Sequence, residues 1–310
     1  MNPGPPGPQP GILSKLNYGS FFSPCPFHHV SEVHKFIIYN LLKFGNIALF
    51  MVGIHKGIKI SEDVWWVGVK DYSKRTFDAI VPLPKGTSYN SYLIKGKEKI
   101  ALIDTVYSKL YNEFESRISS ITDISNIDYI IMNHAEPDHA SSIPYILEKS
   151  KKAKLITSPL GAKMAKIFYD VPEDRIIIVK DNDTIDLGGK TLKFILTPMV
   201  HWPETMFTYL VEDKILFSCD FFGAHITEGL FDYEVEDIIT PAQEYFGEIM
   251  MPYRQSALNA LNKISNLDIK IIAPSHGVIY TNPNKIIEKY NEWVNGKTKR
   301  KVTIIYVSAW

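Results

Sequence analysis

The chain has 310 residues, 45% of them hydrophobic and 22% charged, and its 34 basic residues equal its 34 acidic residues in number. This balance is ordinary for a globular protein, and charge alone gives no reason to expect a nucleic-acid or membrane partner. The two cysteines, Cys25 and Cys219, provide neither a disulfide framework nor a CxxC metal motif. We therefore expect a cytoplasmic protein of one or two domains.

Residues 1–55 differ in composition from the rest of the chain. Met1–Gly11 is rich in proline and glycine, which predicts a poorly structured segment. The apolar run Phe36–Ile54 is interrupted by the charge of Lys43 and is shorter than a comfortable membrane span. We interpret residues 1–55 as an extension to a domain that begins at about residue 56.

From Ile58 onward the pattern predicts strands and helices in turn. Gly188-Gly189 separates two of the strands and is a hairpin signal. The predicted strands cover residues 64–69, 87–94, 100–103, 129–132, 154–157, 175–179, 183–187, 192–196, 206–211, 215–219, 269–273 and 302–307. The predicted helices cover residues 110–118, 143–151, 161–169 and 283–295. Hairpins followed by strand–helix units indicate an α/β sandwich rather than one parallel sheet.

Four polar residues follow the predicted strand 129–132 directly: His134, Glu136, Asp138 and His139. The carboxyl end of a buried strand is where α/β proteins commonly place their sites. Pro137 stiffens the loop by fixing φ. A solvated polar turn is the alternative interpretation of this cluster taken alone.

Three later strands each deliver one further ligand-type residue at the carboxyl end: His201, Asp220 and His276. If these strand ends share an edge, two metal ions could be held there, with Asp220 as the bridge between them. His134, Glu136 and His201 would bind one ion, and Asp138 and His276 the other, with His139 as an additional candidate. The alternative is three unrelated polar residues in loops. A donor set of imidazoles and carboxylates suits iron or manganese as well as zinc.

The pattern His-x-Glu-x-Asp-His at residues 134–139 resembles that of flavodiiron proteins, the oxygen and nitric oxide reductases of the metallo-β-lactamase superfamily. Hydrolases of that superfamily carry a histidine at the position of Glu136. Further segments that match the family are residues 86–93, 101–105, 197–206, 217–223 and 274–277. The resemblance covers about residues 58–310, and it implies a metallo-β-lactamase-like αββα sandwich over residues 56–297.

The resemblance also implies roles for individual residues. It places His134, Glu136 and His201 at one iron, Asp138 and His276 at the other, and Asp220 between them, while members differ on whether the residue at His139 binds. Asp104 is expected to orient a ligand imidazole or to cap a turn, Trp202 to shield the site or pack in the core, and His225 to line the substrate cavity. Many members carry a histidine where this chain has Asp78, so no role is transferred to that position.

The activity implied by the resemblance is reduction of O2 to water or of NO to N2O in a homodimer, with electrons from FMN or a rubredoxin-type donor. In the family, a strand such as 302–307 opens an FMN-binding flavodoxin-like domain. Residues 298–310 are therefore expected to be a linker and first-strand stub, with FMN bound only if such a domain or a partner is supplied.

Two alternatives to a reductase remain at this point. A dinuclear zinc hydrolase of a thioester, lactone or phosphoester would use the metal pair to activate water. Glu136 and the flavodoxin-like stub argue against it. A non-catalytic remnant is opposed by the complete ligand set.

Overall fold

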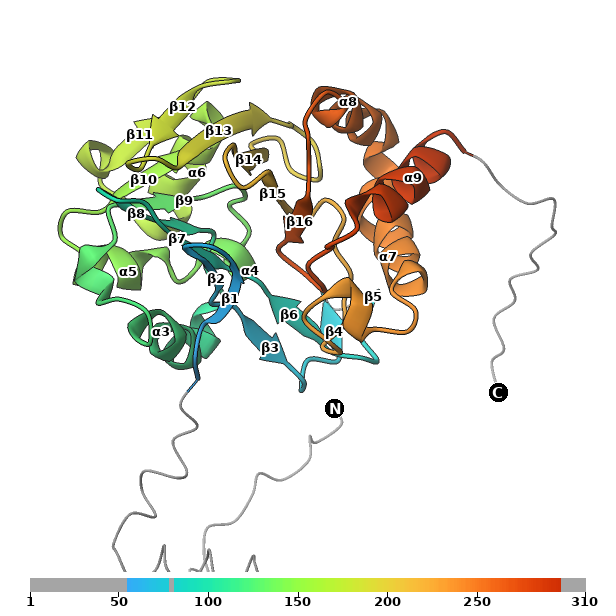
Figure 1. Ribbon diagram of the computed structural model, residues 1–310, viewed down its shortest axis with the longest axis horizontal. Helices are drawn as coiled ribbons and strands as arrows, with labels where there is room; N and C mark the ends of the chain where they lie inside the picture. Colours follow the sequence, from blue (N-terminus) through green and yellow to red (C-terminus); the bar gives the residue numbers. More distant parts are fainter. Residues whose placement is uncertain (1–54, 78–80, 297–310) are drawn as a thin grey trace, which may run out of the picture. The chain divides into compact units, whose positions relative to one another are not determined.

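The computed structural model describes residues 55–77 and 81–296 (Figure 1). The extension predicted for residues 1–55 and the stub predicted for residues 298–310 lie outside these residues, apart from His55. Asp78 lies outside them as well.

Two β-sheets form the centre of the described domain. The first has the spatial order β1-β2-β7-β8-β9-β10-β11, and the second has the order β12-β13-β14-β15-β16. The first sheet consists of β1 (Ile58–Ser61), β2 (Val64–Trp66), β7 (Tyr92–Lys95), β8 (Ile100–Ile103), β9 (Tyr129–Ile131), β10 (Lys154–Thr157) and β11 (Ile176–Ile178). The second consists of β12 (Thr184–Asp186), β13 (Thr191–Leu196), β14 (Met206–Leu210), β15 (Ile215–Cys219) and β16 (Ile271–Pro274). Two short ribbons pair β3 (Val69–Asp71) with β6 (Thr87–Tyr89) and β4 (Thr76–Phe77) with β5 (Val81–Pro82).

Helices cover the outer face of each sheet (Figure 1). The first sheet packs against α3 (Tyr111–Ser119), α5 (Ile143–Lys149) and α6 (Pro159–Tyr169). The second packs against α7 (Ile239–Tyr245), α8 (Arg254–Ile264) and α9 (Pro283–Val294). A π-helical turn, Phe246–Met250, follows α7 directly. The αββα sandwich that the resemblance implied is thereby confirmed.

Alternation of side chains along the strands builds a layer on each side of a sheet. In β9, Ile130 belongs to the core beneath the helices, whereas Ile131 belongs to the core between the two sheets. Phe194 in β13 meets the same inter-sheet core, and Ile195 beside it faces α8 and α9. This period of two is what a strand buried on both faces requires.

Most of the strands that end at the candidate site lie in parallel pairs, whereas β13, which leads to His201, pairs antiparallel with β12 and β14. Leu102 of β8 pairs with Ile130 of β9, which is in register with Leu155 of β10. In the second sheet, β15 and β16 are likewise parallel, with Leu216 opposite Ile272. Parallel register brings the carboxyl ends of neighbouring strands to one edge, which the sequence analysis required for the site.

Two predicted strands are broken in the structure. Residues 64–69 divide at Gly68, where a Cβ atom would lie 2.4 Å from the Tyr89 carbonyl oxygen. Residues 87–94 divide at Asn90, whose side chain accepts a hydrogen bond from Trp66 Nε1 at 2.9 Å and donates to the Pro274 carbonyl at 2.9 Å. The periodicity of a single segment carries no information on such long-range contacts. For residues 239–264 the pattern predicts no element, yet these residues form α7, the π turn and α8.

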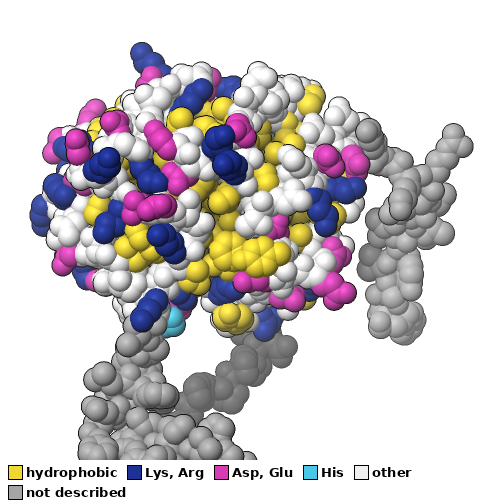
Figure 2. All heavy atoms as spheres, viewed as in Figure 1, with side chains coloured by type: hydrophobic (Ala, Val, Ile, Leu, Met, Phe, Trp, Pro, Cys, Tyr) yellow, Lys and Arg dark blue, Asp and Glu magenta, His cyan; other side chains and the backbone are white. Residues whose placement is uncertain are grey.

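Charges of both signs are mixed on the face that Figure 2 shows, and hydrophobic side chains gather near its centre. This mixture agrees with the equal numbers of basic and acidic residues in the chain. Among the helices of residues 55–77 and 81–296, none has the length and apolar character that crossing a membrane requires.

Candidate metal centre

The loop after β9 carries four of the predicted ligands. It leads into the one-turn helix α4 (Pro137–Ala140), in which proline takes the first helical position. The backbone N–H of His139 donates to the Glu136 carbonyl at 3.0 Å. This turn fixes the spacing of Glu136, Asp138 and His139 on one short piece of backbone.

A buried carboxylate anchors this loop to β8. Asp104 accepts hydrogen bonds from the backbone N–H of Asn133 at 2.8 Å and from its side-chain amide at 3.0 Å. The Asn133 side-chain oxygen in turn accepts from the Thr208 hydroxyl of the second sheet at 2.7 Å. Burial raises the pKa of Asp104 to about 6. Asp104 therefore acts on the loop through Asn133, which differs from the expected contact with a ligand imidazole.

The five-stranded sheet supplies the other three predicted ligands. His201 lies in the loop between β13 and β14, and Asp220 follows β15, where Cys219 adopts a φ of 49°. His276 lies just beyond β16, and its Nδ1 donates to the Ser88 carbonyl at 2.6 Å. That bond leaves Nε2 of His276 free to face the site.

Asp220 lies between four imidazoles. Its Oδ2 is 3.5 Å from His134 Nε2 and 3.2 Å from His201 Nε2. Its Oδ1 is 2.9 Å from His139 Nε2 and 3.5 Å from His276 Nε2. Each of the two carboxylate oxygens thus faces its own pair of histidines.

One further carboxylate completes each half of the arrangement. Glu136 Oε2 lies 3.0 Å from His134 Nε2 and 3.2 Å from His201 Nε2. Asp138 Oδ2 lies 3.2 Å from His276 Nε2 and 3.4 Å from His139 Nε2. We call His134, Glu136 and His201 with Asp220 Oδ2 the first ligand group, and Asp138, His139 and His276 with Asp220 Oδ1 the second ligand group. All seven predicted residues converge, and His139 falls in the second group.

Burial and local charge act in opposite directions on these residues. Burial disfavours ionised Glu136, but hydrogen bonds from two imidazoles outweigh it and lower its pKa to about 2. Burial likewise disfavours protonated His139, yet the carboxylates of Asp138 and Asp220 raise its pKa to about 9. The pKa of His201 also rises to about 9. Without metal, the ionised Glu136 therefore lies in a cluster in which His139 and His201 are favoured as imidazolium groups, and a divalent cation would replace those protons.

The residues present fit a metal pair on chemical grounds. Asp138 Oδ1 and Oδ2 and Asp220 Oδ1 are buried and make no hydrogen bond within the described part of the chain, and neither ring nitrogen of His139 makes one. Imidazole nitrogens lie 2.9–3.5 Å from two of these oxygens, Asp138 Oδ2 and Asp220 Oδ1, without meeting hydrogen-bond geometry. Buried carboxylate oxygens that lack hydrogen bonds are costly, and cations would satisfy them. Cys219 lies near His139 and Asp220, and burial raises the pKa of its thiol well above the usual value, which favours the neutral thiol in the metal-free chain. The donor set is imidazole nitrogen and carboxylate oxygen.

Glu204 contacts a predicted ligand but was not among the site residues predicted from the sequence. Its Oε1 lies 2.7 Å from His134 Nδ1 and accepts a hydrogen bond from the Ala135 N–H at 2.8 Å. The Trp202 ring stands edge-on to His134, with a centroid distance of 5.0 Å, so it shields this imidazole. An acidic residue three positions after His201, in the same turn, was the available signal for Glu204.

A small cavity opens onto the site. Its lining includes the side chains of Glu136 and Asp138 together with Phe77, Tyr89 and Tyr107, and its volume is about 170 Å³. A water molecule takes about 30 Å³ in the liquid, so the cavity has room for a few small molecules. Its walls are largely aromatic where they are not ligands.

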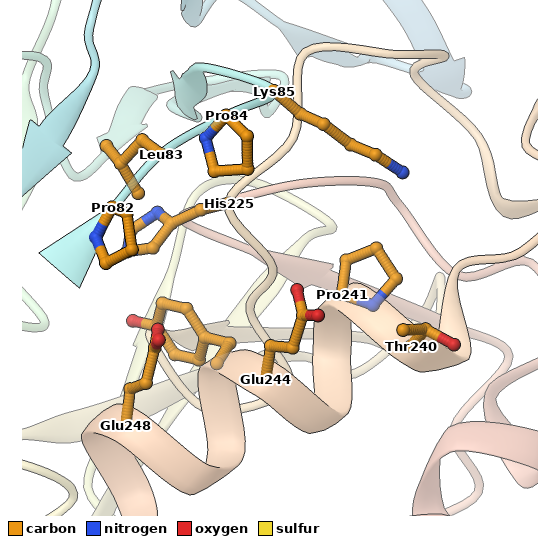
Figure 3. A pocket seen from close by; sticks show the side chains of 10 residues that line it. Pro82, Leu83, Pro84, Lys85, His225, Thr240, Pro241, Glu244 and Glu248 are labelled. Atoms are coloured by element: carbon orange, nitrogen blue, oxygen red, sulfur yellow. The ribbon is translucent and has the colours of Figure 1, made fainter. Parts of the chain in front are cut away.

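A second cavity lies beside the site (Figure 3). In Figure 3, His225 lies across this cavity from the helix that bears Glu244 and Glu248. The ring of His225 is 4.8 Å from that of His276, and its Nδ1 lies 2.9 Å from the Thr87 hydroxyl oxygen. His225 was expected to line the substrate cavity; it lines this neighbouring cavity, whose lining does not include Glu136 or Asp138.

Residues 87–277 match the family model described as ODP family beta lactamase. The chain belongs to this family. The matched residues include every member of the first and second ligand groups. The ODP domain is thus the part of the chain that holds the candidate site.

Relatives of the ODP domain include proteins named for a diiron centre. The flavo-diiron protein FprA2 of Clostridium acetobutylicum is 40% identical over 263 residues, covering 82% of this chain and 66% of that protein. The nitric oxide reductase of Moorella thermoacetica is 37% identical over 260 residues, covering 82% of this chain and 65% of that protein. The solved structure of rubredoxin oxygen:oxidoreductase from the anaerobe Desulfovibrio gigas matches with a TM-score of 0.74 at 31% identity, covering 77% of this chain and 62% of that one.

This chain therefore spans 62–66% of the length of these three proteins. The ODP domain is homologous to the diiron domain of flavodiiron proteins, as the motif at residues 134–139 indicated.

Proposed function

We propose that the ODP domain holds two iron ions and reduces O2 to water, NO to N2O, or both. The observation that carries this proposal is the position of Asp220, whose two carboxylate oxygens each face a separate group of two imidazoles and one carboxylate. That is the arrangement of a bridged metal pair. Glu136 gives the first ligand group a carboxylate where a zinc hydrolase of this superfamily would have a histidine, and carboxylates favour the harder, higher oxidation states of iron.

The chain's own residues position the pair. The first ligand group would hold one ion and the second ligand group the other, with Asp220 shared. A bound ferrous pair would supply two electrons, one from each ion. These suffice to join two NO into N2O, whereas reduction of O2 to water takes four electrons and so also needs the external donor. Trp202 packs edge-on against His134 and covers that imidazole.

The size of the cavity supports a diatomic substrate. About 170 Å³ beside Glu136 and Asp138 accommodates O2 or NO. The carboxylate at Glu136 and the relatives named as a flavo-diiron protein and a nitric oxide reductase count against the hydrolase alternative.

The names of the relatives support the choice of substrates and electron donors. One is a nitric oxide reductase and another a rubredoxin oxygen:oxidoreductase. We accordingly propose FMN of a flavodoxin-like domain, a separate flavoprotein or a rubredoxin as the donor to this chain. A homodimer and a cytoplasmic location are part of the same proposal.

The decisive experiment measures metal content and single-turnover chemistry on the full chain purified without oxygen. We expect about two irons per chain, and the chemically reduced protein should convert two NO to one N2O or consume O2 without an added flavin. Glu136→His should lower iron occupancy and abolish turnover. Glu228→His makes the same replacement at an exposed loop position and should leave both unchanged.

Two results would refute the proposal. One is two zinc ions with thioester or lactone turnover, which would establish a hydrolase. The other is a folded chain that takes up less than one metal ion when both iron and zinc are offered.

A further inference from the structure

The side chain of Glu204 contacts the first ligand group and is almost fully buried, with 2% exposure. Its Oε1 lies 2.7 Å from His134 Nδ1 and 2.8 Å from the Ala135 nitrogen, so one oxygen serves the ligand and its neighbour. An acceptor at Nδ1 fixes the tautomer of an imidazole and leaves Nε2 unprotonated for a metal. The Nε2 atom of His134 is the one that faces Glu136 and Asp220.

The backbone around Glu204 is fixed from two sides. The Ser158 hydroxyl, at the start of α6, donates to the Glu204 carbonyl at 2.6 Å. Two residues further on, the Met206 N–H donates to the Asn133 carbonyl at 3.0 Å. The loop that carries His201 is thereby joined to the loop that carries His134. One short segment both contributes a ligand to the first group and orients a second ligand of that group.

The two ligand groups differ in the partners that face the Nδ1 atoms of their histidines. His276 in the second group donates Nδ1 to a neutral carbonyl, that of Ser88. His139 in the same group has no hydrogen-bond partner at Nδ1 within residues 55–77 and 81–296. His134 has a carboxylate instead, which is a stronger acceptor and adds negative charge beyond the ligand.

We propose that Glu204 is the positioning residue of the first ligand group: it holds His134 in the tautomer and orientation that bind metal, and so governs affinity at that half of the pair. This inference rests on the metal centre proposed above. A carboxylate behind a ligand imidazole raises its basicity, and loss of such a partner typically weakens metal binding about 10- to 100-fold.

The test is Co(II) titration of the metal-free full chain, with the wild type compared with Glu204→Ala, Glu204→Gln and Glu204→Asp. In Glu204→Ala we expect the Co(II) dissociation constant of one of the two sites to rise about 10- to 100-fold, with the dissociation constant of the other site almost unchanged. Glu204→Gln retains an oxygen for His134 Nδ1 but not the charge, and should recover part of the loss. Glu204→Asp keeps the charge but withdraws the oxygen by one methylene, and should resemble Glu204→Ala.

A spectroscopic readout separates positioning from general stability. In the Co(II) protein, the Nδ1–H of His134 should give a hyperfine-shifted, slowly exchanging proton signal, because Glu204 holds it away from solvent. That signal should persist in Glu204→Gln and disappear in Glu204→Ala and Glu204→Asp. Thermal unfolding of each metal-free variant shows whether it is folded. If Glu204→Ala does not fold, Glu204→Asp serves as the variant that tests the role of Glu204.

The possible failures can be told apart. A folded wild-type chain that binds no Co(II) would refute the metal centre itself. A different result would refute only the role of Glu204. In that result the wild type binds Co(II) at two sites, and Glu204→Asp and Glu204→Ala show the same dissociation constants and the same proton signal as the wild type. Equal weakening at both sites would also refute it, because the contact reaches only the first ligand group.

Discussion

Replacing Ser158 by alanine should destabilise the protein by more than the loss of a helix cap. The Ser158 hydroxyl oxygen accepts from the Gly161 N–H at 3.1 Å at the start of α6, and the hydroxyl donates to the Glu204 carbonyl at 2.6 Å. Loss of an N-cap serine costs about 1 kcal/mol. Leaving a buried carbonyl without its donor costs a further 1–3 kcal/mol, roughly. We expect Ser158→Ala to lower the free energy of unfolding by about 2–4 kcal/mol.

The assay is urea unfolding of the metal-free chain, followed by circular dichroism at one pH. Asp123→Ala is the matched control, because Asp123 caps a short helix by accepting from the Ser125 N–H at 2.8 Å at an exposed position. It should cost about 1 kcal/mol or less. Equal losses in the two variants would refute the reasoning, since they would mean that the bond to the Glu204 carbonyl contributes nothing.

Three further changes test other parts of the centre. In the metal-free protein, the raised pKa values of His139 and His201 stabilise the folded state fully below pH 6.5, and this contribution is lost as the pH rises through about 9. The free energy of unfolding should fall by about 3 kcal/mol per histidine at most, as measured by urea unfolding with chelator present. Gly277→Ala places a Cβ 2.7 Å from the Ala224 carbonyl oxygen at a φ of 79° and should cost more than Gly189→Ala. Gly189 has a similar φ of 81°, but a Cβ there meets only Lys97 Cε at 3.9 Å, an ordinary contact. Thermal unfolding measures both. Burial and the charge of the neighbouring His276 lower the pKa of His225, so NMR of labelled histidine should show no titration of His225 near pH 6.5.

Each of these has an outcome that would contradict it. Stability of the metal-free chain that does not fall between pH 6.5 and 9 would contradict the ion pairing of the imidazoles, whereas saturation with metal should suppress the fall, because bound imidazoles are neutral. Equal losses in Gly277→Ala and Gly189→Ala would mean that the backbone around Ala224 yields at no cost. A His225 midpoint near its ordinary value would show that water reaches the ring.

The ligand set was predictable because its members follow strands. Each of His134, Asp220 and His276 comes within a few residues of an apolar run that reads as a buried strand, and parallel strands end at one edge. His139 could be proposed but not assigned, because the direction of its ring depends on Asp220, which is 81 positions away by subtraction.

Contacts between distant segments explain what the sequence did not predict. The role of Glu204 depends on its contact with His134, which follows a strand of the other sheet. The break at Asn90 depends on Trp66 and Pro274, and no local pattern contains all three. Asp104 illustrates the same limit, since its position at a strand end was visible but its partner Asn133 was not.

The division of the ligands between the two sheets also bears on the order of assembly. His134 to His139 belong to the seven-stranded sheet, whereas His201, Asp220 and His276 belong to the five-stranded one. Neither sheet alone offers a complete ligand group, so ions can be held tightly only after both have packed face to face. Tight metal binding therefore requires the packed pair of sheets, and a chain whose sheets have met incorrectly would lack a complete ligand group.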